Sequence, residues 1–153
     1  MTTGRLAGIA RHDRPKGPME TLERVSVTVA EGVHGDFRGA LAVTKPGRKR
    51  QVSLLEADGW QLAVAETGAH LAWKDSRRNL LLEGVRLPRA TGTRVRVGNG
   101  LVIEITGECD PCERMDALHG GLRAALTPDW RGGFVGRVVE DGEIAIGDEI
   151  RVL

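Results

Sequence analysis

The segment Leu101-Val-Ile-Glu-Ile-Thr-Gly-Glu-Cys-Asp-Pro-Cys-Glu-Arg-Met115 has the clearest structural pattern in the chain, and it contains both cysteines. Apolar residues alternate from Leu101 to Ile105, as in a half-buried β-strand. Asp110 suits the N-cap of a helix and Pro111 suits its first position, with a glutamate at capping-box spacing. The segment therefore predicts a strand, a tight turn and the start of a helix.

Cys112 falls in the first turn of this predicted helix. Unpaired amide groups and the positive end of the helix dipole favour a thiolate at such a position. Arg114 supports the same charge state, whereas Asp110 and Glu113 oppose it. The turn is therefore a candidate site for sulfur chemistry, and Cys109 is a candidate partner for Cys112 at C-x-x-C spacing.

Elsewhere the sequence predicts about seven to nine short strands and two or three helices, as in a β-barrel or sandwich. Expected strands are residues 4–11, 22–29, a short buried strand near 80–82, a hairpin of 93–97 and 101–106 around Gly98-Asn-Gly100, residues 135–139, and one or two strands from 143 to the C-terminus. One helix is predicted from Ser53, at capping-box spacing from Glu56, to Gly68. Another follows the stripe from Met115 to Leu126.

Composition limits the class of protein. At 153 residues the chain fits one domain with a proper core, so residues 1–153 are expected to form a single domain. The 22 basic residues nearly balance the 21 acidic ones, so overall charge does not favour a nucleic-acid partner. No apolar run is long enough to span a membrane, and the N-terminus lacks the apolar core of a signal peptide. Two cysteines in such a chain indicate a cytoplasmic protein.

Several motifs, in their order along the chain, resemble the MOSC domain, the C-terminal domain of molybdenum-cofactor sulfurases. They are Gly32-Val-His-Gly-Asp36, Arg50-Gln-Val-Ser-Leu54 followed by Glu56, Arg78-Asn-Leu80 with Gly84, Gly98 before an Ile/Val strand, Pro111-Cys112, Arg131-Gly-Gly133, and Gly142-Glu-Ile144 followed by Gly147-Asp148. The resemblance covers residues 32–153. The early glycine-aspartate motif departs from the family, because it continues with Phe37-Arg38 where a histidine is common.

The resemblance implies a mostly-β fold, α+β in detail: a closed or partly open barrel related to the pyruvate-kinase β-barrel domain, with a few short helices. It also implies one reactive cysteine, matched by Cys112, that carries sulfur as a persulfide or ligates molybdenum. The chain would then be a sulfurtransferase-like protein or a component of a molybdenum-dependent oxidoreductase. A cysteine desulfurase or a redox protein would be its partner, because the pyridoxal-phosphate-dependent domain of larger members is absent here.

If the molybdenum cofactor (molybdopterin) binds, its phosphate needs cationic partners. Loop arginines are candidates, although such residues are usually solvated; the predicted cofactor-binding set is Arg50, Arg77, Arg78, Arg131, the Gly132–Gly133 amides and Asn79. Asn79 could contact a pterin edge or cap a loop. Asp36 and His34 are auxiliary candidates, together with Cys109.

Three alternatives stay open. A zinc site would need two histidines beside the two cysteines, and His119 is too far along a straight helix from Cys112. A binding module could use the basic turn at residues 48–50 to dock an acidic partner or RNA. A dithiol redox protein would use Cys109 and Cys112 equally.

Overall fold

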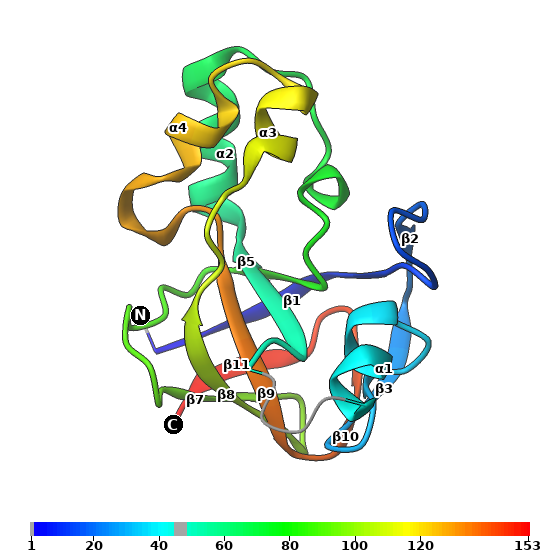
Figure 1. Cartoon of the computed structure of the whole chain (residues 1–153). Helices are drawn as coiled ribbons and strands as arrows, with labels where there is room; N and C mark the ends of the chain where they lie inside the picture. Colours follow the sequence, from blue (N-terminus) through cyan, green and yellow to red (C-terminus); the bar gives the residue numbers. More distant parts are fainter. Residues whose placement is uncertain (1, 45–48) are drawn as a thin grey trace.

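A closed β-barrel dominates the computed structural model, which describes residues 2–44 and 49–153. Its seven strands are β1 (Thr3–Arg11), β5 (Val52–Glu56), β6 (Leu80–Glu83), β7 (Arg94–Val97), β8 (Leu101–Glu108), β9 (Phe134–Glu140) and β11 (Glu149–Val152). Their order is β11-β7-β8-β9-β5-β6-β1, and β1 also pairs with β11, which closes the ring (Figure 1). The predicted mostly-β barrel with a few short helices is confirmed.

Smaller strands complete the sheet structure. β2 (Glu20–Thr21) pairs with β1, and β3 (Arg24–Thr28), β4 (Gly32–Val33) and β10 (Gly142–Ala145) form a three-stranded sheet. The hairpin predicted around Gly98-Asn-Gly100 is confirmed, because β7 and β8 pair with Val97 opposite Leu101. The glycine before the turn suits its position, since φ is +67° at Gly98.

Two apolar clusters lie on opposite sides of β5 and β6. Leu54, Leu80 and Leu82 belong to the cluster inside the barrel, whereas Leu55 and Leu81 pack toward the helices outside it. β5 and β6 are parallel neighbours, with Leu54 opposite Leu80. Strands covered on both faces are apolar without alternation, which explains the unbroken leucine run in β6.

The helix predicted from Ser53 to Gly68 is wrong in its first turn. Residues up to Glu56 form β5, and α2 (Ala57–Thr67) begins after it. Ser53 and Glu56 have capping-box spacing, but neither side chain caps α2: Ser53 bonds to Asn79, and no side-chain cap bond is made at Glu56. The predicted end is right, since Gly68 caps α2 with φ +71°.

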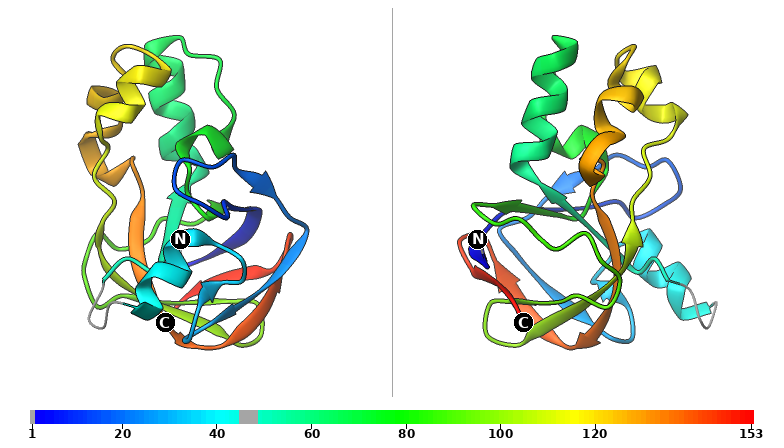
Figure 2. Two further views of the ribbon diagram at one scale, coloured as in Figure 1. Left: turned by 45° about the vertical axis from the view of Figure 1, so that its right-hand side comes forward. Right: turned by 90° about the vertical axis from the view of Figure 1, so that its left-hand side faces the viewer.

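The second predicted helix is divided into two short ones. α3 (Glu113–Leu118) ends before Gly120-Gly121, and α4 (Leu122–Leu126) follows. With α2 they form a helical end above the barrel, while α1 (Phe37–Thr44) lies beside its lower part (Figures 1 and 2). Two 3-10 turns, η1 (Trp73–Ser76) and η2 (Pro128–Trp130), complete the described structure. No helix that the structure describes has the length and apolar character needed to cross a membrane.

Candidate functional site

Both cysteines lie where β8 leaves the barrel and the chain turns toward α3. Cys109 is buried, and its amide donates to the carbonyl oxygen of Gly133 at 2.9 Å. Cys112 is exposed and occupies the N-cap of α3, so the predicted helix start at Pro111 is two residues too early. Both thiols are free, and they differ sharply in access to solvent.

A buried arginine supports this turn from below. The Arg78 guanidinium donates through Nε to the Gly132 carbonyl oxygen and through Nη1 to the Ser76 carbonyl oxygen, both at 2.8 Å. Burial lowers the pKa of Arg78, and the neighbouring Cys109 opposes that shift. Arg78 therefore joins the segment before β9 to the loop before β6 and presents positive charge near both sulfur atoms.

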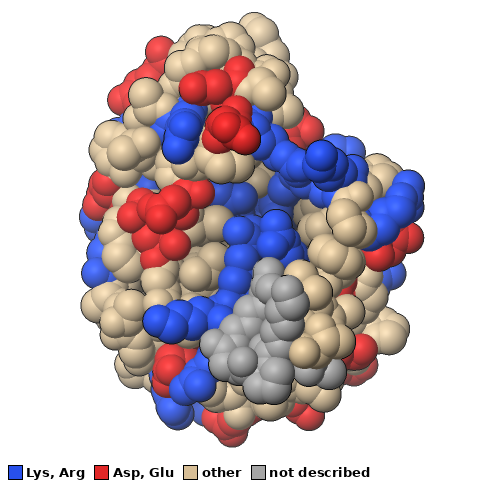
Figure 3. Space-filling view, viewed as in Figure 1, with Lys and Arg blue, Asp and Glu red and all other residues tan. Residues whose placement is uncertain are grey.

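Cys112 faces a pocket of about 550 Å³ between the helical end of the molecule, the loop after β1 and the start of α1. Cations dominate its lining, as the blue surface in the central hollow of Figure 3 shows. The lining residues are His12, Pro15, Lys16, Phe37, Arg38, Arg50, Ser76, Arg77, Arg78, Asp110, Cys112, Arg114 and Met115. Asp110 is the one carboxylate among them.

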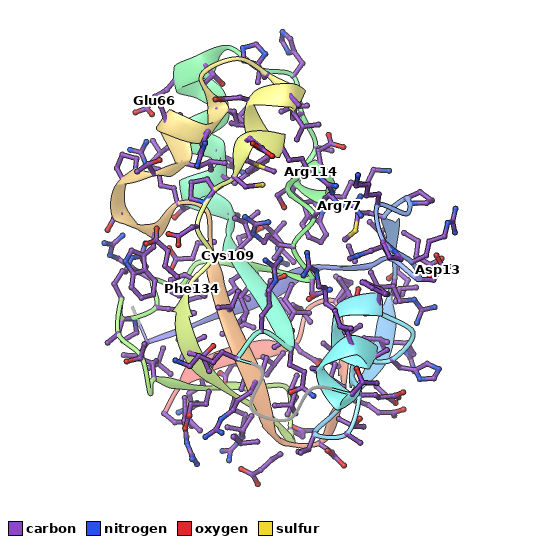
Figure 4. All side chains as sticks on the ribbon, viewed as in Figure 1. Asp13, Glu66, Arg77, Cys109, Arg114 and Phe134 are labelled. Carbon is purple, nitrogen blue, oxygen red and sulfur yellow. The ribbon has the colours of Figure 1, made fainter. Side chains whose placement is uncertain are left out.

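The pocket lining also contains three arginines whose charges act on a histidine, His12. Arg77 and Arg114 come from the loop after η1 and from α3, and they lie close together in Figure 4. Burial lowers the pKa of Arg77, and the charges of Arg114 and Arg38 lower it further. Burial also lowers the pKa of His12; Asp36 opposes this shift, while the same three arginines add to it.

The structure separates the predicted cofactor-binding residues into two groups. Arg50, Arg77 and Arg78 line the pocket with Cys112. Arg131 does not: its Nη1 donates to Glu66 at 2.6 Å and to the Ala125 carbonyl oxygen at 3.1 Å. The sequence pattern could not reveal this, because a loop arginine gives no sign of its partner.

Asn79 is also outside the pocket lining. Its side-chain oxygen accepts from the amide and hydroxyl of Ser53, and its Nδ2 donates to the Ala10 carbonyl oxygen. Of the two roles the sequence left open, the geometry favours the structural one. Gly132 and Gly133 likewise have their amides committed to Leu126 and Trp130 carbonyl oxygens. Neither amide is available for the anion predicted there.

The auxiliary candidates have local partners. Asp36 is buried and accepts hydrogen bonds from the amides of His12, Arg38 and Gly39, which orders the start of α1 next to the pocket. His34 is exposed, pairs with Glu31 at 2.8 Å and is not part of the pocket lining. Asp36 therefore supports the pocket indirectly.

The zinc alternative finds no cluster to support it: within residues 2–44 and 49–153, no three His, Cys, Asp or Glu side chains are grouped to hold a metal ion. His119 instead contacts the Thr67 carbonyl oxygen at 2.9 Å. Of the predicted basic turn, Arg48 lies outside the described residues, and Arg50 belongs to the pocket. A wider depression of about 830 Å³ opens elsewhere on the barrel, and its described lining residues include neither a cysteine nor a histidine.

Three cationic side chains and one histidine of the pocket lining were absent from the predicted site set: Lys16, Arg38, Arg114 and His12. They come from three separate segments, and no local motif unites them. Only the fold brings them together beside Arg77.

Fold and site together define a class: small closed-barrel proteins with an exposed thiol at the edge of a cationic pocket. The family model of the MOSC domain matches residues 33–151, and the chain belongs to this family. Domains of this family are associated with molybdenum-cofactor sulfurases and related proteins. No curated protein matches the sequence.

Solved structures agree on the fold. The YuaD protein from Bacillus subtilis is 19% identical with a TM-score of 0.81, and the match covers 98% of this chain and 95% of that one. YiiM from Escherichia coli is 12% identical with a TM-score of 0.69, covering 97% and 69%. YiiM from Geobacillus stearothermophilus is 14% identical with a TM-score of 0.65, covering 98% and 73%.

Proposed function

We propose that this protein binds the molybdenum cofactor in the pocket beside Cys112, and that the Cys112 sulfur either ligates the molybdenum or carries sulfur to it. One observation carries the proposal: the exposed Cys112 is part of the lining of a cationic pocket of about 550 Å³. A thiol placed there can meet an anionic ligand and also be reached by a partner protein.

The pocket residues fit the chemistry of this cofactor. Thiolate sulfur is a soft ligand that suits sulfur-rich metal centres. Arginine binds phosphate through paired N–H groups, and Arg50 and Arg77 are both in the lining. The Nη2 atom of Arg77 is buried without a hydrogen-bond partner, so it has a donor to offer a bound anion. When bound, the molybdenum centre would supply the redox chemistry.

The chain's own residues have distinct tasks in this proposal. Arg78 is fixed by two carbonyl oxygens and keeps positive charge under the turn that carries Cys112. Arg50 and Arg77 orient the anionic end of the ligand. Asp36 holds the start of α1, so the pocket wall is set before any ligand arrives.

The exposure of Cys112 specifically favours sulfur carriage. In that reaction, the Cys112 thiolate attacks the outer sulfur of a persulfide on a donor protein, such as a cysteine desulfurase. The S–S bond of the donor breaks, its cysteine leaves as a thiolate, and Cys112 becomes a persulfide. One sulfur atom moves, and no external oxidant or reductant is consumed. Cys109 is too buried to meet a donor protein in the same way.

Metal analysis of protein purified from a host that makes the cofactor tests the binding proposal. We expect molybdenum to copurify with the wild type and to be lost in Cys112→Ser or in Arg77→Gly. Cys109→Ser is the matched control, because it removes the other thiol and leaves the pocket lining intact. Full molybdenum content in Cys112→Ser, with no persulfide trapped on the wild type, would refute both forms of the proposal.

A further inference from the structure

The helix α3, which begins directly after Cys112, is weakly attached to the rest of the molecule. Its six residues are too few for a helix that is stable by itself, so its order depends on tertiary contacts. Cys112 occupies the N-cap, and its side chain makes no cap bond in the described structure. Within residues 113–118, all of which the structure describes, Met115 is the one buried side chain, and it packs among apolar residues of α2 and α4. A single apolar anchor therefore holds this helix.

The C-terminal end of α3 leads into a glycine pair with open space around it. A Cβ added at Gly120 would meet no described atom within 4 Å. Gly121 has φ +91°, which glycine adopts without strain, and an added Cβ there would first meet a Thr67 methyl group at 3.9 Å. Hinges are a few positions of this kind that absorb a change in φ and ψ. Gly120 and Gly121 are therefore suited to act as a hinge between α3 and α4.

The segments on either side of α3 are better fixed. Cys109 and Pro111, before the helix, are both buried. Leu122 and Leu126 of α4, after the hinge, are also buried. The part of the chain that can move as a unit is therefore residues 112–120, which carries the exposed thiol.

Three polar contacts hold α3 in its observed position. Arg123 of α4 donates through Nε to the Pro111 carbonyl oxygen at 3.3 Å, and its amide donates to Asp116 Oδ1 at 3.0 Å. At the other end of α3, His119 Nε2 is 2.9 Å from the Thr67 carbonyl oxygen, which can only accept, so this nitrogen carries a proton. These contacts are exposed or partly buried. Because water can replace them, each contributes little net free energy.

Charge on the pocket side of α3 favours its movement away from the pocket. Arg114 of α3 lies close to Arg77, which follows η1 (Figure 4). Burial lowers the pKa of Arg77, and the charge of Arg114 lowers it further. Like charges at short range repel each other, and salt screens this repulsion. The observed position of α3 therefore has an electrostatic cost that opening would release.

From these contacts we propose that α3 is a flap that opens about Gly120 and Gly121 and carries Cys112 away from the pocket. In the closed state, which the structure shows, the thiol is part of the pocket lining. In the open state it extends further into solvent. The motion does not depend on what the pocket holds, but its use rests on the proposed function. The open state presents Cys112 to the partner protein, and the closed state returns its sulfur to the bound ligand.

Amide hydrogen exchange of the ligand-free full chain, followed by NMR, tests the flap. The His119 amide, bonded to the Met115 carbonyl oxygen, reports on α3. The Ala125 amide, bonded to the Gly121 carbonyl oxygen, is the matched control, because α4 is equally short but has two buried leucines. We expect the His119 amide to be about ten- to hundred-fold less protected than the Ala125 amide, since local opening needs no global unfolding. Equal protection of the two amides would overturn the flap.

Substitutions at the hinge and at the contacts of α3 distinguish a flap from a frayed helix end. Gly120 lies outside the left-handed region, so Gly120→Ala should stiffen the hinge and raise the protection of α3 about two- to five-fold. Gly107→Ala, the same replacement in open space outside α3, should leave it unchanged. Arg123→Gln should lower protection about three- to ten-fold. Arg114→Gln should raise it, as should added salt. Lower protection in Arg114→Gln, or no change in Gly120→Ala, would contradict the flap.

The flap and the proposed function can fail separately. Low protection of α3 in a protein that never acquires molybdenum or a persulfide would support the flap and refute the proposed function. A persulfide trapped on Cys112, combined with equal protection of α3 and α4, would do the opposite.

Discussion

Replacing Asn79 with alanine is the substitution whose cost follows most directly from the structure. Its side chain accepts hydrogen bonds from the Ser53 amide at 3.0 Å and hydroxyl at 3.2 Å, and donates to the Ala10 carbonyl oxygen at 3.1 Å. Asn79 is 4% exposed and Ser53 is 2% exposed, so water cannot replace these partners. The side chain connects β5 and β6 to β1.

Alanine removes all three bonds and leaves a buried N–H of Ser53 and a buried C=O of Ala10 unsatisfied. Each unsatisfied group costs about 1–3 kcal/mol, so we expect a loss of about 3–5 kcal/mol in the free energy of unfolding. That loss is a large share of the stability of a typical domain, about 5–15 kcal/mol.

Equilibrium unfolding in urea measures this loss, provided that fluorescence and circular dichroism give coincident transitions. Asn99→Ala is the matched control, since Asn99 is exposed in the turn between β7 and β8, and we expect it to change stability by less than about 1 kcal/mol. The molybdenum content of folded Asn79→Ala should equal that of the wild type. Equal stability of the two alanine variants, combined with loss of molybdenum from Asn79→Ala, would refute the structural role and restore Asn79 as a ligand-binding residue.

Two further predictions concern the barrel strand that leads to the cysteines and the glycine that packs beside it. Gly133→Ala should lower the free energy of unfolding in urea by about 2–4 kcal/mol. The reason is that φ is +107° at Gly133 and an added Cβ would lie 2.4 Å from the Leu54 carbonyl oxygen. Gly107→Ala is the control and should lower it much less, because the space around Gly107 is open. Burial, and then the neighbouring Asp110, raise the pKa of the Glu108 carboxyl group. Protonated Glu108 therefore favours the folded state, and this stabilisation is lost as the pH rises above about 4.5, the ordinary pKa of the group. Glu108→Gln should therefore be more stable than the wild type at neutral pH and no more stable in acid; a gain that persists in acid would contradict this.

The strands that the sequence predicts well are those whose pattern is local. Alternation in β8 and the Gly98-Asn-Gly100 turn determine the hairpin without help from distant residues. The error at Ser53 and Glu56 has the opposite origin. Their spacing matches a helix cap, but Ser53 bonds to Asn79 and Glu56 accepts from Arg89 and the Leu87 amide, partners more than twenty residues away.

The residues of the candidate site likewise differ in whether a local sequence pattern or a tertiary contact determines their role. Cys112 follows from a local motif, so it was found in the sequence. Arg131 and Asn79 belong to motifs of the family, but their partners are fixed by tertiary contacts that no motif states. Arg38 and Arg114 line the pocket because α1 and α3 both face it. The spacing of these residues in the sequence does not indicate that the two helices lie near each other.

The mass of the intact protein after incubation with a cysteine desulfurase and free cysteine tests the central role of Cys112 most directly. We predict that the wild type and Cys109→Ser each gain one sulfur atom, that reductant removes it, and that Cys112→Ser gains none. Equal labelling of Cys112→Ser and the wild type would contradict the assignment of the reactive sulfur to Cys112.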